Sequence, residues 1–402
     1  MREKKISFKK FITNKPLYYK EIDHKRVHKA YAILKPHIKN PLVIHIVGTN
    51  GKGSTGRIMA TLLHCSDYKV GHFSSPHILK FNERIWIEGK DISDSRLEIA
   101  HNKLYSILGQ KVCDALSYFE YTTLLALVAM EELDIIVLEA GLGGEFDATN
   151  VVSKELSVIT PIGLDHQDFL GDTIASIATT KLNSMERRVI LGFQPNQEVY
   201  QIANVIAKER GAKVYTLLGT DGFSLDLFGT KVSNSKELLS ITKELGWSHY
   251  LYENALLATS ALDVLNLSYS IKNIKNIKLF GRFYSIAPNV IIDVGHNLLA
   301  TEAIAVALEQ KFGNNKVVLV YNSLNDKDYN AILNRLKKHI KRVEIIAIDS
   351  DRAIDVTILQ AKLRELSIEY REFKTINNYE NYLVFGSFFV VEAFIKNNLL
   401  QI

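Results

Sequence analysis

Short β-branched runs alternate along the chain with longer stretches of helical periodicity. In the first part of the sequence, the expected strands cover residues 42–47, 135–138, 156–160 and 189–191, and the expected helices cover 57–65, 119–133, 198–210 and 250–265. Strands that alternate with helices in this way favour right-handed βαβ units. The pattern therefore predicts a mostly parallel sheet with helices on both faces.

A second alternation follows the polar stretch 272–276, with expected strands at 290–292, 317–321 and 343–348 and expected helices at 298–312, 329–339 and 356–366. At 402 residues, the chain exceeds the usual size of one hydrophobic core. We therefore expect an α/β protein of two domains, 1–280 and 281–402. The first contains a P-loop-type sheet flanked by helices, and the second is smaller and Rossmann-like.

Composition and charge narrow the class of protein. Hydrophobic residues make up 47% and charged residues 23% of the chain, as in ordinary globular proteins. The net charge of +5 is small for this length. The basic cluster 337–342 is short and is expected to be a solvated helix end, so no nucleic-acid partner is predicted.

The sequence also lacks signals for export or membrane insertion. No apolar run follows the charged residues 1–5, and none later in the chain is long enough to cross a bilayer. Cys65 and Cys113 have no metal-type spacing and do not form a disulfide scaffold pattern. These features predict a cytoplasmic protein without a membrane partner.

The most informative local pattern is the run from Gly48 to Thr55, where an apolar strand meets a glycine-rich turn and a helix. Glycines allow successive backbone N–H groups to face phosphate oxygens, and the helix adds its positive end. Lys52 would neutralise phosphates, and the Ser54 hydroxyl would face magnesium. An ordinary turn with a solvated lysine is the alternative, because only two residues separate Gly48 from Gly51-Lys52.

Other polar residues also follow strand-like runs. Glu139 ends one run and precedes a glycine-rich segment, a position suited to a magnesium ligand, although a solvated acid at a strand end is the simpler alternative. The pair Asp165-His166 has a similar setting. In the second domain, Asp293 stands before His296 and Asn297, and Asn297 alone is better explained as a helix cap.

Taken in order, these motifs resemble the signatures of folylpolyglutamate synthase and dihydrofolate synthase, members of the Mur ligase superfamily. The matching segments are Thr49-Asn50-Gly51-Lys52-Gly53-Ser54, Ser74-Ser75-Pro76-His77-Ile78, Tyr118-Phe119-Glu120, Glu139-Ala140-Gly141-Leu142-Gly143-Gly144, Asp147-Ala148-Thr149-Asn150, Asp165-His166, Gly281-Arg282 and Asp293 with His296-Asn297. The resemblance spans nearly the whole chain.

The resemblance implies ATP-dependent joining of L-glutamate to dihydropteroate and to tetrahydrofolates through an acyl phosphate. It further implies that residues 1–280 form the ATP-binding, Mur-ligase-type domain with the folate or pterin site and that 281–402 form the ligase domain. The implied partners are small molecules, namely dihydropteroate or folates, L-glutamate and ATP. The implied cofactors are magnesium at two sites, a carbamylated Lys181 and, optionally, a monovalent cation; the expected state is a monomer.

The resemblance also assigns roles to individual residues, with the nucleotide held from both domains. The implied ATP-binding residues are Thr49, Asn50, Gly51, Lys52, Gly53, Ser54, Asn254, Arg282 and Asp293. The implied metal ligands are Ser75, Glu139 and His166, and the implied catalytic residues are Lys181, His166 and Glu139. The implied substrate-binding residues are Phe119, Glu120, Tyr121, Phe146, Asp147 and Ala148.

Lys181 lies in a segment that departs from the family pattern; Val294-Gly295 and Phe280 also replace more usual neighbours but leave the named ligands in place. The usual Glu-Lys-Ala-Gly-Ile is replaced by Thr180-Lys181-Leu182-Asn183-Ser184. A carbamate would convert the lysine from a cation into an anion able to bridge to a second metal. A plain surface lysine or a phosphate-binding lysine remains the alternative.

Three other functions compete with the bifunctional ligase. Two are of the same class: a monofunctional folylpolyglutamate synthase and another Mur-type amino-acid ligase. The third is a nucleotide-binding switch that ligates nothing. A switch has no need of Arg282 and Asp293 acting on the same nucleotide.

Overall fold

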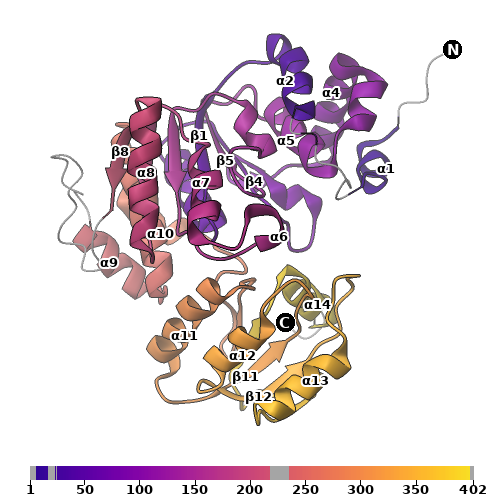
Figure 1. Ribbon diagram of the computed structural model, residues 1–402, viewed down its shortest axis with the longest axis vertical. Coiled ribbons are helices and arrows are strands. Elements are labelled where there is room, and N and C mark those ends of the chain that lie inside the picture. The colour runs from indigo at the N-terminus through magenta and orange to yellow at the C-terminus, as the bar shows by residue number, and fades with distance from the viewer. Residues whose placement is uncertain (1–5, 17–22, 24, 218–234, 399–402) are drawn as a thin grey trace. The chain divides into compact units, whose positions relative to one another are not determined.

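The computed structural model describes residues 6–16, 23, 25–217 and 235–398, which fall into two compact units (Figure 1). The first unit comprises Met1–Glu237 and Asn254–Asn276, and the second comprises Leu238–Glu253 and Ile277–Ile402. Each unit has its own sheet and hydrophobic core.

An eight-stranded sheet forms the centre of the first unit, in the order β4-β3-β2-β5-β1-β6-β7-β8. Strands β2, β5, β1, β6, β7 and β8 run parallel, whereas β3 and β4 are antiparallel at one edge. The predicted mostly parallel sheet is confirmed. The strands are β1 (Leu42–Val47), β2 (Val70–Phe73), β3 (Ile85–Ile87), β4 (Lys90–Asp91), β5 (Ile135–Glu139), β6 (Leu156–Ile159), β7 (Arg188–Leu191) and β8 (Lys213–Thr216).

Helices pack on both faces of this sheet, as predicted. The helices up to the second sheet are α1 (Phe8–Thr13), α2 (Arg26–Leu34), α3 (Lys52–His64), α4 (Asp94–Ala115), α5 (Tyr118–Ala129), α6 (Gln167–Leu170), α7 (Ile174–Leu182), α8 (Gln197–Arg210), α9 (Ser235–Glu244) and α10 (His249–Val264), with 3-10 turns η1 (Lys35–His37), η2 (Phe81–Arg84), η3 (Ala148–Val151) and η4 (Ile271–Asn276). Helices α9 and α10 contribute residues to both units.

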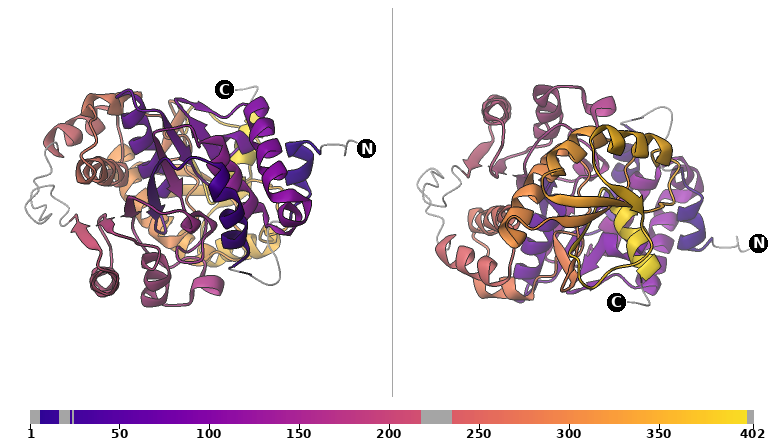
Figure 2. Two further views of the ribbon diagram at one scale, coloured as in Figure 1. Left: turned by 90° about the horizontal axis from the view of Figure 1, so that it is seen from above. Right: turned by 90° about the horizontal axis from the view of Figure 1, so that it is seen from below.

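The alternation of side chains along β1 explains how its two faces are covered. Val43 and Val47 point to one face, where Val43 packs in the core beneath α4 and α5, and Val47 packs in the core beneath α7 and α8. Ile46 points to the other face and meets α3 at Gly56. Figure 1 shows α7 and α8 side by side, and Figure 2 shows α2 and α4 packed together.

The strand order determines which loops are neighbours. Strand β1 pairs with β5 on one side and with β6 on the other, all three in parallel. The segments that begin at Gly48, Ala140 and Thr160 therefore emerge at the same edge of the sheet. In open parallel sheets, this carboxyl edge is where ligands bind.

The second unit has a six-stranded sheet in the order β13-β12-β11-β14-β10-β9, with only β9 antiparallel. This confirms the smaller second α/β fold. Its strands are β9 (Tyr284–Ala287), β10 (Val290–Ile292), β11 (Val317–Tyr321), β12 (Ile340–Ile345), β13 (Tyr370–Glu372) and β14 (Tyr382–Phe385), and its helices are α11 (Leu298–Phe312), α12 (Tyr329–Leu336), α13 (Val356–Glu365) and α14 (Phe388–Asn398).

One prediction about this unit is wrong. The basic cluster 337–342 is not a solvated helix end, because α12 stops at Leu336 and the last three residues of the cluster begin β12. Arg342 is buried, and its guanidinium pairs with Glu344 at 2.7 Å and Glu380 at 2.6 Å. The sequence pattern did not reveal these carboxylates, which come from the same strand and from a distant loop.

Within the described part of the chain, none of the helices combines the length and the apolar character that a bilayer crossing requires.

Candidate functional site

The loop after β1 is anchored to the segment that follows β6. The N–H groups of Thr49 and Asn50 donate to the Pro161 carbonyl at 2.9 and 3.3 Å, and the Thr49 hydroxyl donates to the Gly163 carbonyl at 3.0 Å. These two amides are therefore used inside the loop. The amides of the first turn of α3, which begins at Lys52, have no acceptor within their own helix and are the ones suited to an anion.

Two glycines give the loop its shape. Gly51 has φ of 86°, a left-handed conformation that other residues rarely adopt. Gly48 passes so close to β6 that a Cβ there would lie 2.0 Å from the Thr160 hydroxyl oxygen. Glycine is therefore required at Gly51 because of its backbone conformation and at Gly48 because no side chain fits there. The sequence pattern predicted a tight glycine turn but not these two specific causes.

Two lysines converge on the same loop carbonyl. Lys52 Nζ donates to the carbonyls of Gly48 and Thr49, each at 3.1 Å, and Lys181 Nζ donates to the Gly48 carbonyl at 2.9 Å. Lys181 comes from α7 and is buried. This burial excludes the alternative that Lys181 is a plain surface lysine.

Burial also changes the acid–base behaviour of Lys181. Desolvation is the main cause, and the nearby positive charge of Lys52 adds to it, so that the pKa of the Lys181 ammonium falls to about 7. Asp165 and Asp147 act in the opposite direction and are weaker. A large fraction of Lys181 is consequently a neutral amine near neutral pH.

Several buried polar atoms around the loop find no hydrogen-bond partner among the described residues. They are Ser54 Oγ and Thr55 Oγ1 in the first turn of α3 and Asn254 Nδ2 on α10. Asn254 lies against the loop, since a Cβ added to Gly51 would be 2.6 Å from Asn254 Oδ1. Unsatisfied buried polar groups are costly, so this cluster is better suited to a polar ligand than to a dry core.

The candidate metal ligands are only partly brought together. The Ser75 N–H donates to Glu139 Oε2 at 3.3 Å, and Glu139 is buried, which excludes the solvated-acid alternative. His166 is exposed and precedes α6 as its N-cap residue with φ of 54°, and its N–H donates to Asp165 Oδ1 at 2.9 Å. No group of three or more His, Cys, Asp or Glu side chains within the described residues is arranged to hold a metal by itself.

Arg57 supplies a cation on the Glu139 side of the loop, and the sequence analysis did not single it out. Its guanidinium stacks on the Trp86 ring at 4.9 Å from the centroid. Burial lowers the pKa of Arg57 to about 10, while Asp91, Glu139 and Glu83 oppose the shift. Arg57 therefore stays charged at neutral pH and partly balances the buried Glu139.

The glycine-rich segment after Glu139 contacts two of the predicted site residues, Asp147 and Phe119, and the helix that carries a third, Lys181. The Asp147 carboxylate accepts the N–H groups of Gly141 and Leu142 at 3.0 and 2.8 Å. The Phe119 ring lies against Gly141, where a Cβ would be 2.5 Å from its nearest atom. The Glu145 N–H donates to the Thr180 carbonyl at 2.9 Å, which ties this segment to the helix of Lys181.

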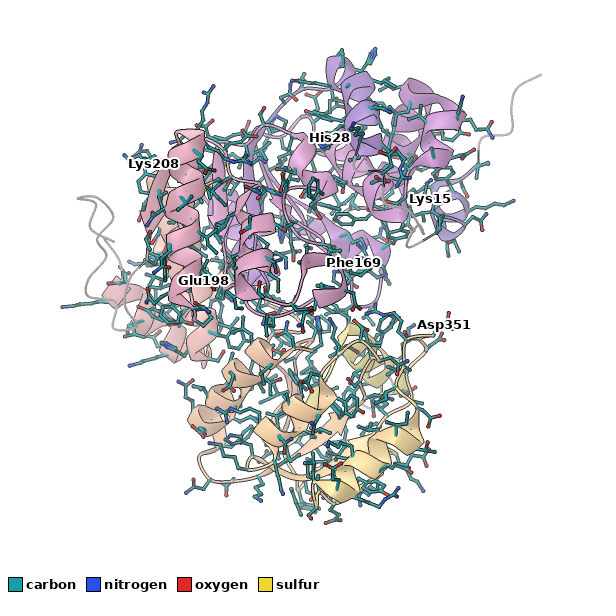
Figure 3. The ribbon with its side chains drawn as sticks, viewed as in Figure 1. Lys15, His28, Phe169, Glu198, Lys208 and Asp351 are labelled. Atoms are coloured by element: carbon teal, nitrogen blue, oxygen red, sulfur yellow. The ribbon has the colours of Figure 1, made fainter. Side chains whose placement is uncertain are left out.

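The remaining predicted substrate residues have different environments. Glu120 closes the capping box of α5 and pairs with Arg26 at 2.8 Å, and Tyr121 is fully buried with its hydroxyl 2.7 Å from His101 Nδ1. Ala148 is buried at the start of η3. Phe146 is 52% exposed and Phe169 of α6, labelled in Figure 3, is 55% exposed, so these two rings can meet a ligand directly.

In the second unit, Asp293 is held by three donors. The Phe283 N–H and the Tyr250 hydroxyl each donate to Asp293 Oδ2 at 2.8 Å, and the Gly295 N–H donates to Oδ1 at 2.7 Å. Burial raises the pKa of Asp293, whereas Arg282 and these hydrogen bonds lower it. Phe283 has φ of 44°, an uncommon conformation that the bond to Asp293 helps to maintain.

Two further side chains complete the comparison with the sequence. Asn297 accepts the Ala300 N–H at 2.9 Å and caps α11, as the simpler interpretation predicted. Gln194, which the sequence analysis missed, is buried; its amide donates to the Thr160 carbonyl and accepts the Ile162 N–H, next to the segment that anchors the β1–α3 loop. Gln194 follows β7 at the carboxyl edge of the sheet. A polar residue at the end of an apolar strand was also the sequence signal that selected Glu139.

Comparison with known proteins places this site in a family. No protein-family model matches the sequence. The dihydrofolate synthase/folylpolyglutamate synthase of Buchnera aphidicola subsp. Schizaphis graminum is 31% identical over 369 residues, which cover 87% of this chain and 86% of the relative.

Solved structures agree. Folylpolyglutamate synthetase of Helicobacter pylori is 37% identical with a TM-score of 0.76 over 98% of both chains. The bifunctional folylpolyglutamate synthase/dihydrofolate synthase of Yersinia pestis, complexed with AMPPNP and Mn ion, is 26% identical with a TM-score of 0.79 over 98% of this chain and 97% of that chain. Because identity above 30% extends over most of both sequences, this protein belongs to the dihydrofolate synthase/folylpolyglutamate synthase family.

Proposed function

We propose that this chain is an ATP-dependent ligase that joins L-glutamate to dihydropteroate and to tetrahydrofolates. The observation that carries the proposal is the gathering of the β1–α3 loop, Glu139 and Lys181 at one sheet edge, in a chain that matches bifunctional relatives over most of its length. Amide formation from a carboxylate needs a better leaving group than oxide. ATP supplies it by converting the substrate carboxylate into an acyl phosphate, which the glutamate amine attacks to give an amide, ADP and phosphate.

The phosphate-binding part of the mechanism falls to α3 and its loop. The free amides of the first helical turn face the oxygens of the triphosphate, with Thr49 to Ser54 forming the loop and Asn254 at its side. Lys52 exchanges the Gly48 and Thr49 carbonyls for phosphate oxygens. These charges act in a partly buried site, where they stabilise the transferring phosphoryl group more than they would in water.

The residues around the loop fit a divalent cation that is also bound by phosphate oxygens. Ser54 Oγ is buried without a partner among the described residues, Glu139 supplies a buried carboxylate and Ser75 lies beside it. We assign Ser75, Glu139 and His166 as magnesium ligands, with Ser54 near the first ion. The cation would neutralise phosphate charge and favour attack on the phosphorus.

Lys181 is proposed to be carbamylated. Carbamate formation needs a neutral amine, and the lowered pKa of Lys181 supplies one near neutral pH. The carbamate would place an anion beside the Gly48 carbonyl, where it could help to hold a second cation. Incubation with ¹³C-bicarbonate should give a carbamate ¹³C NMR signal in the wild type and none in Lys181→Met; the same signal in both would refute the assignment.

For the acceptor end, we propose Phe119 and Phe146 as the main side-chain contacts, with Asp147 and Ala148 shaping the backbone of the substrate site beside them. The exposed Phe146 ring and the Phe119 ring against Gly141 suit a flat heterocycle. Glu120 and Tyr121 would act through the helix α5 that carries Phe119, because both side chains have partners inside the protein.

For the second unit, we propose that Arg282 and Asp293 contact the nucleotide. The support is their mutual proximity and the rigid support of Asp293 by Tyr250, Phe283 and Gly295. On this proposal, residues 1–280 bind ATP and folate and residues 281–402 form the ligase domain. The monomeric state, the cytoplasmic location and the monovalent cation stay predictions from the sequence.

A monofunctional folylpolyglutamate synthase is the second candidate. The match to the Helicobacter pylori folylpolyglutamate synthetase over 98% of both chains favours it. Phosphate release with magnesium ATP and glutamate should be measured side by side with dihydropteroate and with tetrahydrofolate. Turnover with both acceptors supports the bifunctional enzyme, and turnover with tetrahydrofolate alone supports the second candidate.

Two outcomes would contradict the proposal as a whole. Turnover only with a UDP-muramoyl peptide acceptor would indicate another Mur-type ligase. Slow ATP hydrolysis that no acceptor and no glutamate changes would indicate a nucleotide-binding switch.

A further inference from the structure

Three buried polar side chains from two segments form a continuous line beneath the glycine-rich segment. They are His45 on β1, Thr149 on η3 and Asp147 just before it, with exposed fractions of 0%, 0% and 5%. His45 Nε2 lies 2.7 Å from the Thr149 hydroxyl, and that hydroxyl lies 2.5 Å from Asp147 Oδ1. The sequence analysis did not single out His45 and gave Thr149 no role.

The order of donors along this line is fixed by chemistry. A hydroxyl has a single proton, and Thr149 gives it to the Asp147 carboxylate. Thr149 must then accept from His45, which places the ring proton of His45 on Nε2. Burial lowers the pKa of His45, so the ring is neutral, and its Nδ1 has no partner in the described part of the chain.

Asp147 connects these buried side chains to the backbone of the glycine-rich segment. Besides the Thr149 hydroxyl, it accepts the Thr149 N–H at 2.9 Å on Oδ1 and the N–H groups of Gly141 and Leu142 on Oδ2. All four acceptor positions of a carboxylate are therefore filled by the protein. Asp147 holds the backbone that follows Glu139 and supports the position of Phe119 against Gly141.

We propose that Thr149 and His45 are positioning residues for the acceptor site. They hold the Asp147 carboxylate in one orientation, and Asp147 in turn holds the backbone of residues 141–142. That backbone shapes the part of the site proposed to receive the pterin ring. This inference rests on the proposed function for its catalytic consequence, but the holding of the segment itself does not. The β1–α3 loop has separate anchors at Pro161 and Gly163, so its position does not depend on Asp147.

The test compares Thr149→Val, which removes only the hydroxyl, with Thr149→Ser, which keeps it. Thr149→Val should raise the KM for dihydropteroate or tetrahydrofolate roughly tenfold, with the KM for ATP within about twofold of wild type. Thr149→Ser should restore the wild-type KM. Thr259→Val is a matched control, because Thr259 is equally buried in the same unit and its hydroxyl bonds only backbone carbonyls of its own helix.

The variant His45→Leu tests the same proposal independently, because it removes the donor to the Thr149 hydroxyl. It should raise the acceptor KM in the same direction, and the double variant His45→Leu/Thr149→Val should be no worse than Thr149→Val alone, since both act through Asp147. Full additivity of the two effects, or an equal rise in the KM for ATP, would overturn the inference.

Hydrogen exchange separates this inference from the proposed function. Thr149→Val should speed deuterium uptake at residues 141–147, and Thr149→Ser and Thr259→Val should not. Unchanged uptake at 141–147 in Thr149→Val overturns the inference whatever the enzyme does. If Thr149→Val takes up deuterium faster but the wild type ligates glutamate to neither acceptor, the holding role is supported and the proposed function is refuted.

Discussion

Lys181 and Glu139 are charged side chains that the fold buries at the carboxyl edge of the first sheet. An unmodified buried ammonium lowers stability, because desolvation penalises its charged form. Residues retained under such a cost are frequently those that bind or react. At the residue scale, burial therefore separates Lys181 from the many exposed lysines of the chain.

The stability cost of Lys181 predicts a pH effect. In carbon-dioxide-free buffer, the pKa of Lys181 is about 7 in the folded state and near 10.5 when unfolded. Between these values the unfolded chain binds more protons, so the stability of the wild type should rise with pH relative to Lys181→Met, by roughly 1 kcal/mol per pH unit. Urea unfolding at pH 7.5, 8.5 and 9.5 measures this, with Lys208→Met as the exposed control (Figure 3).

A constant stability difference between wild type and Lys181→Met across this range would contradict the buried, uncharged state. The same variant should lose ligase activity by at least about a hundredfold, since neither a carbamate nor a cation can form at this position.

Glu139→Gln tests the metal assignment with little change in volume. We expect magnesium-dependent phosphate release to fall by roughly a hundredfold, because an amide is a much weaker magnesium ligand than a carboxylate. Equilibrium binding of ATP without magnesium should change little. Glu132→Gln, an exposed partner of Lys39, is the control, and equal activity of Glu139→Gln and wild type would refute the assignment.

At the scale of elements, the central strands carry histidines that the sheet buries. His45 on β1 and His72 on β2 are both fully buried, and burial lowers the pKa of each well below its usual value. His72 packs against α3 at Gly56, and neither of its ring nitrogens has a partner within the described residues. Strand register thus places these two imidazole rings in the core, where a protonated, charged ring would be strongly destabilising.

This arrangement predicts acid sensitivity. As pH falls below about 6.5, the unfolded chain takes up protons that the folded chain excludes, so stability should decrease on acidification. His72→Leu should flatten this acid limb, because one of the two histidines no longer titrates. Unfolding midpoints from pH 7.5 to 5 measure the slope, and an unchanged slope in His72→Leu would contradict the prediction; His28→Leu is the exposed control (Figure 3).

At the scale of the whole molecule, the chain uses two α/β units and places predicted nucleotide contacts in both. Asn254 belongs to the first unit, whereas Arg282 and Asp293 belong to the second. Helix α10 carries Asn254 and, one turn earlier, the Tyr250 that holds Asp293. On the proposed assignment of these contacts, turnover needs residues of both units, whereas a simple nucleotide-binding switch does not.

Arg282→Ala tests this requirement. Glutamate-dependent ATP turnover should fall at least about tenfold through a higher KM for ATP, because one charge-assisted contact with the nucleotide is lost. Arg335→Ala, which removes a half-buried arginine paired with Glu302 in the same unit, should behave like wild type. Unchanged turnover in Arg282→Ala would exclude a nucleotide role for the second unit.

The sequence by itself determined the alternation of strands and helices and several of these elements, although it did not predict β2, α4, α7, β14 or α14. Apolar periodicity is local, so the strands 42–47, 290–292 and 317–321 and the helix 298–312 were predicted with the bounds that the structure has. Glycine spacing and the lysine beside it likewise predicted a phosphate loop between β1 and α3, and the structure gives this loop two glycines that other residues could not replace. The order of motifs along the chain then indicated the family.

Only the tertiary structure decided the pairing of polar groups, because their partners are distant in sequence. Arg342 changed from a solvated charge to a buried one through Glu344 and Glu380. Asp147, which the resemblance assigned to substrate binding, lies at the centre of a hydrogen-bond network that includes His45, 102 positions earlier in the chain. Strand order, which brings β5 and β6 to either side of β1, is a long-range property that local periodicity does not encode.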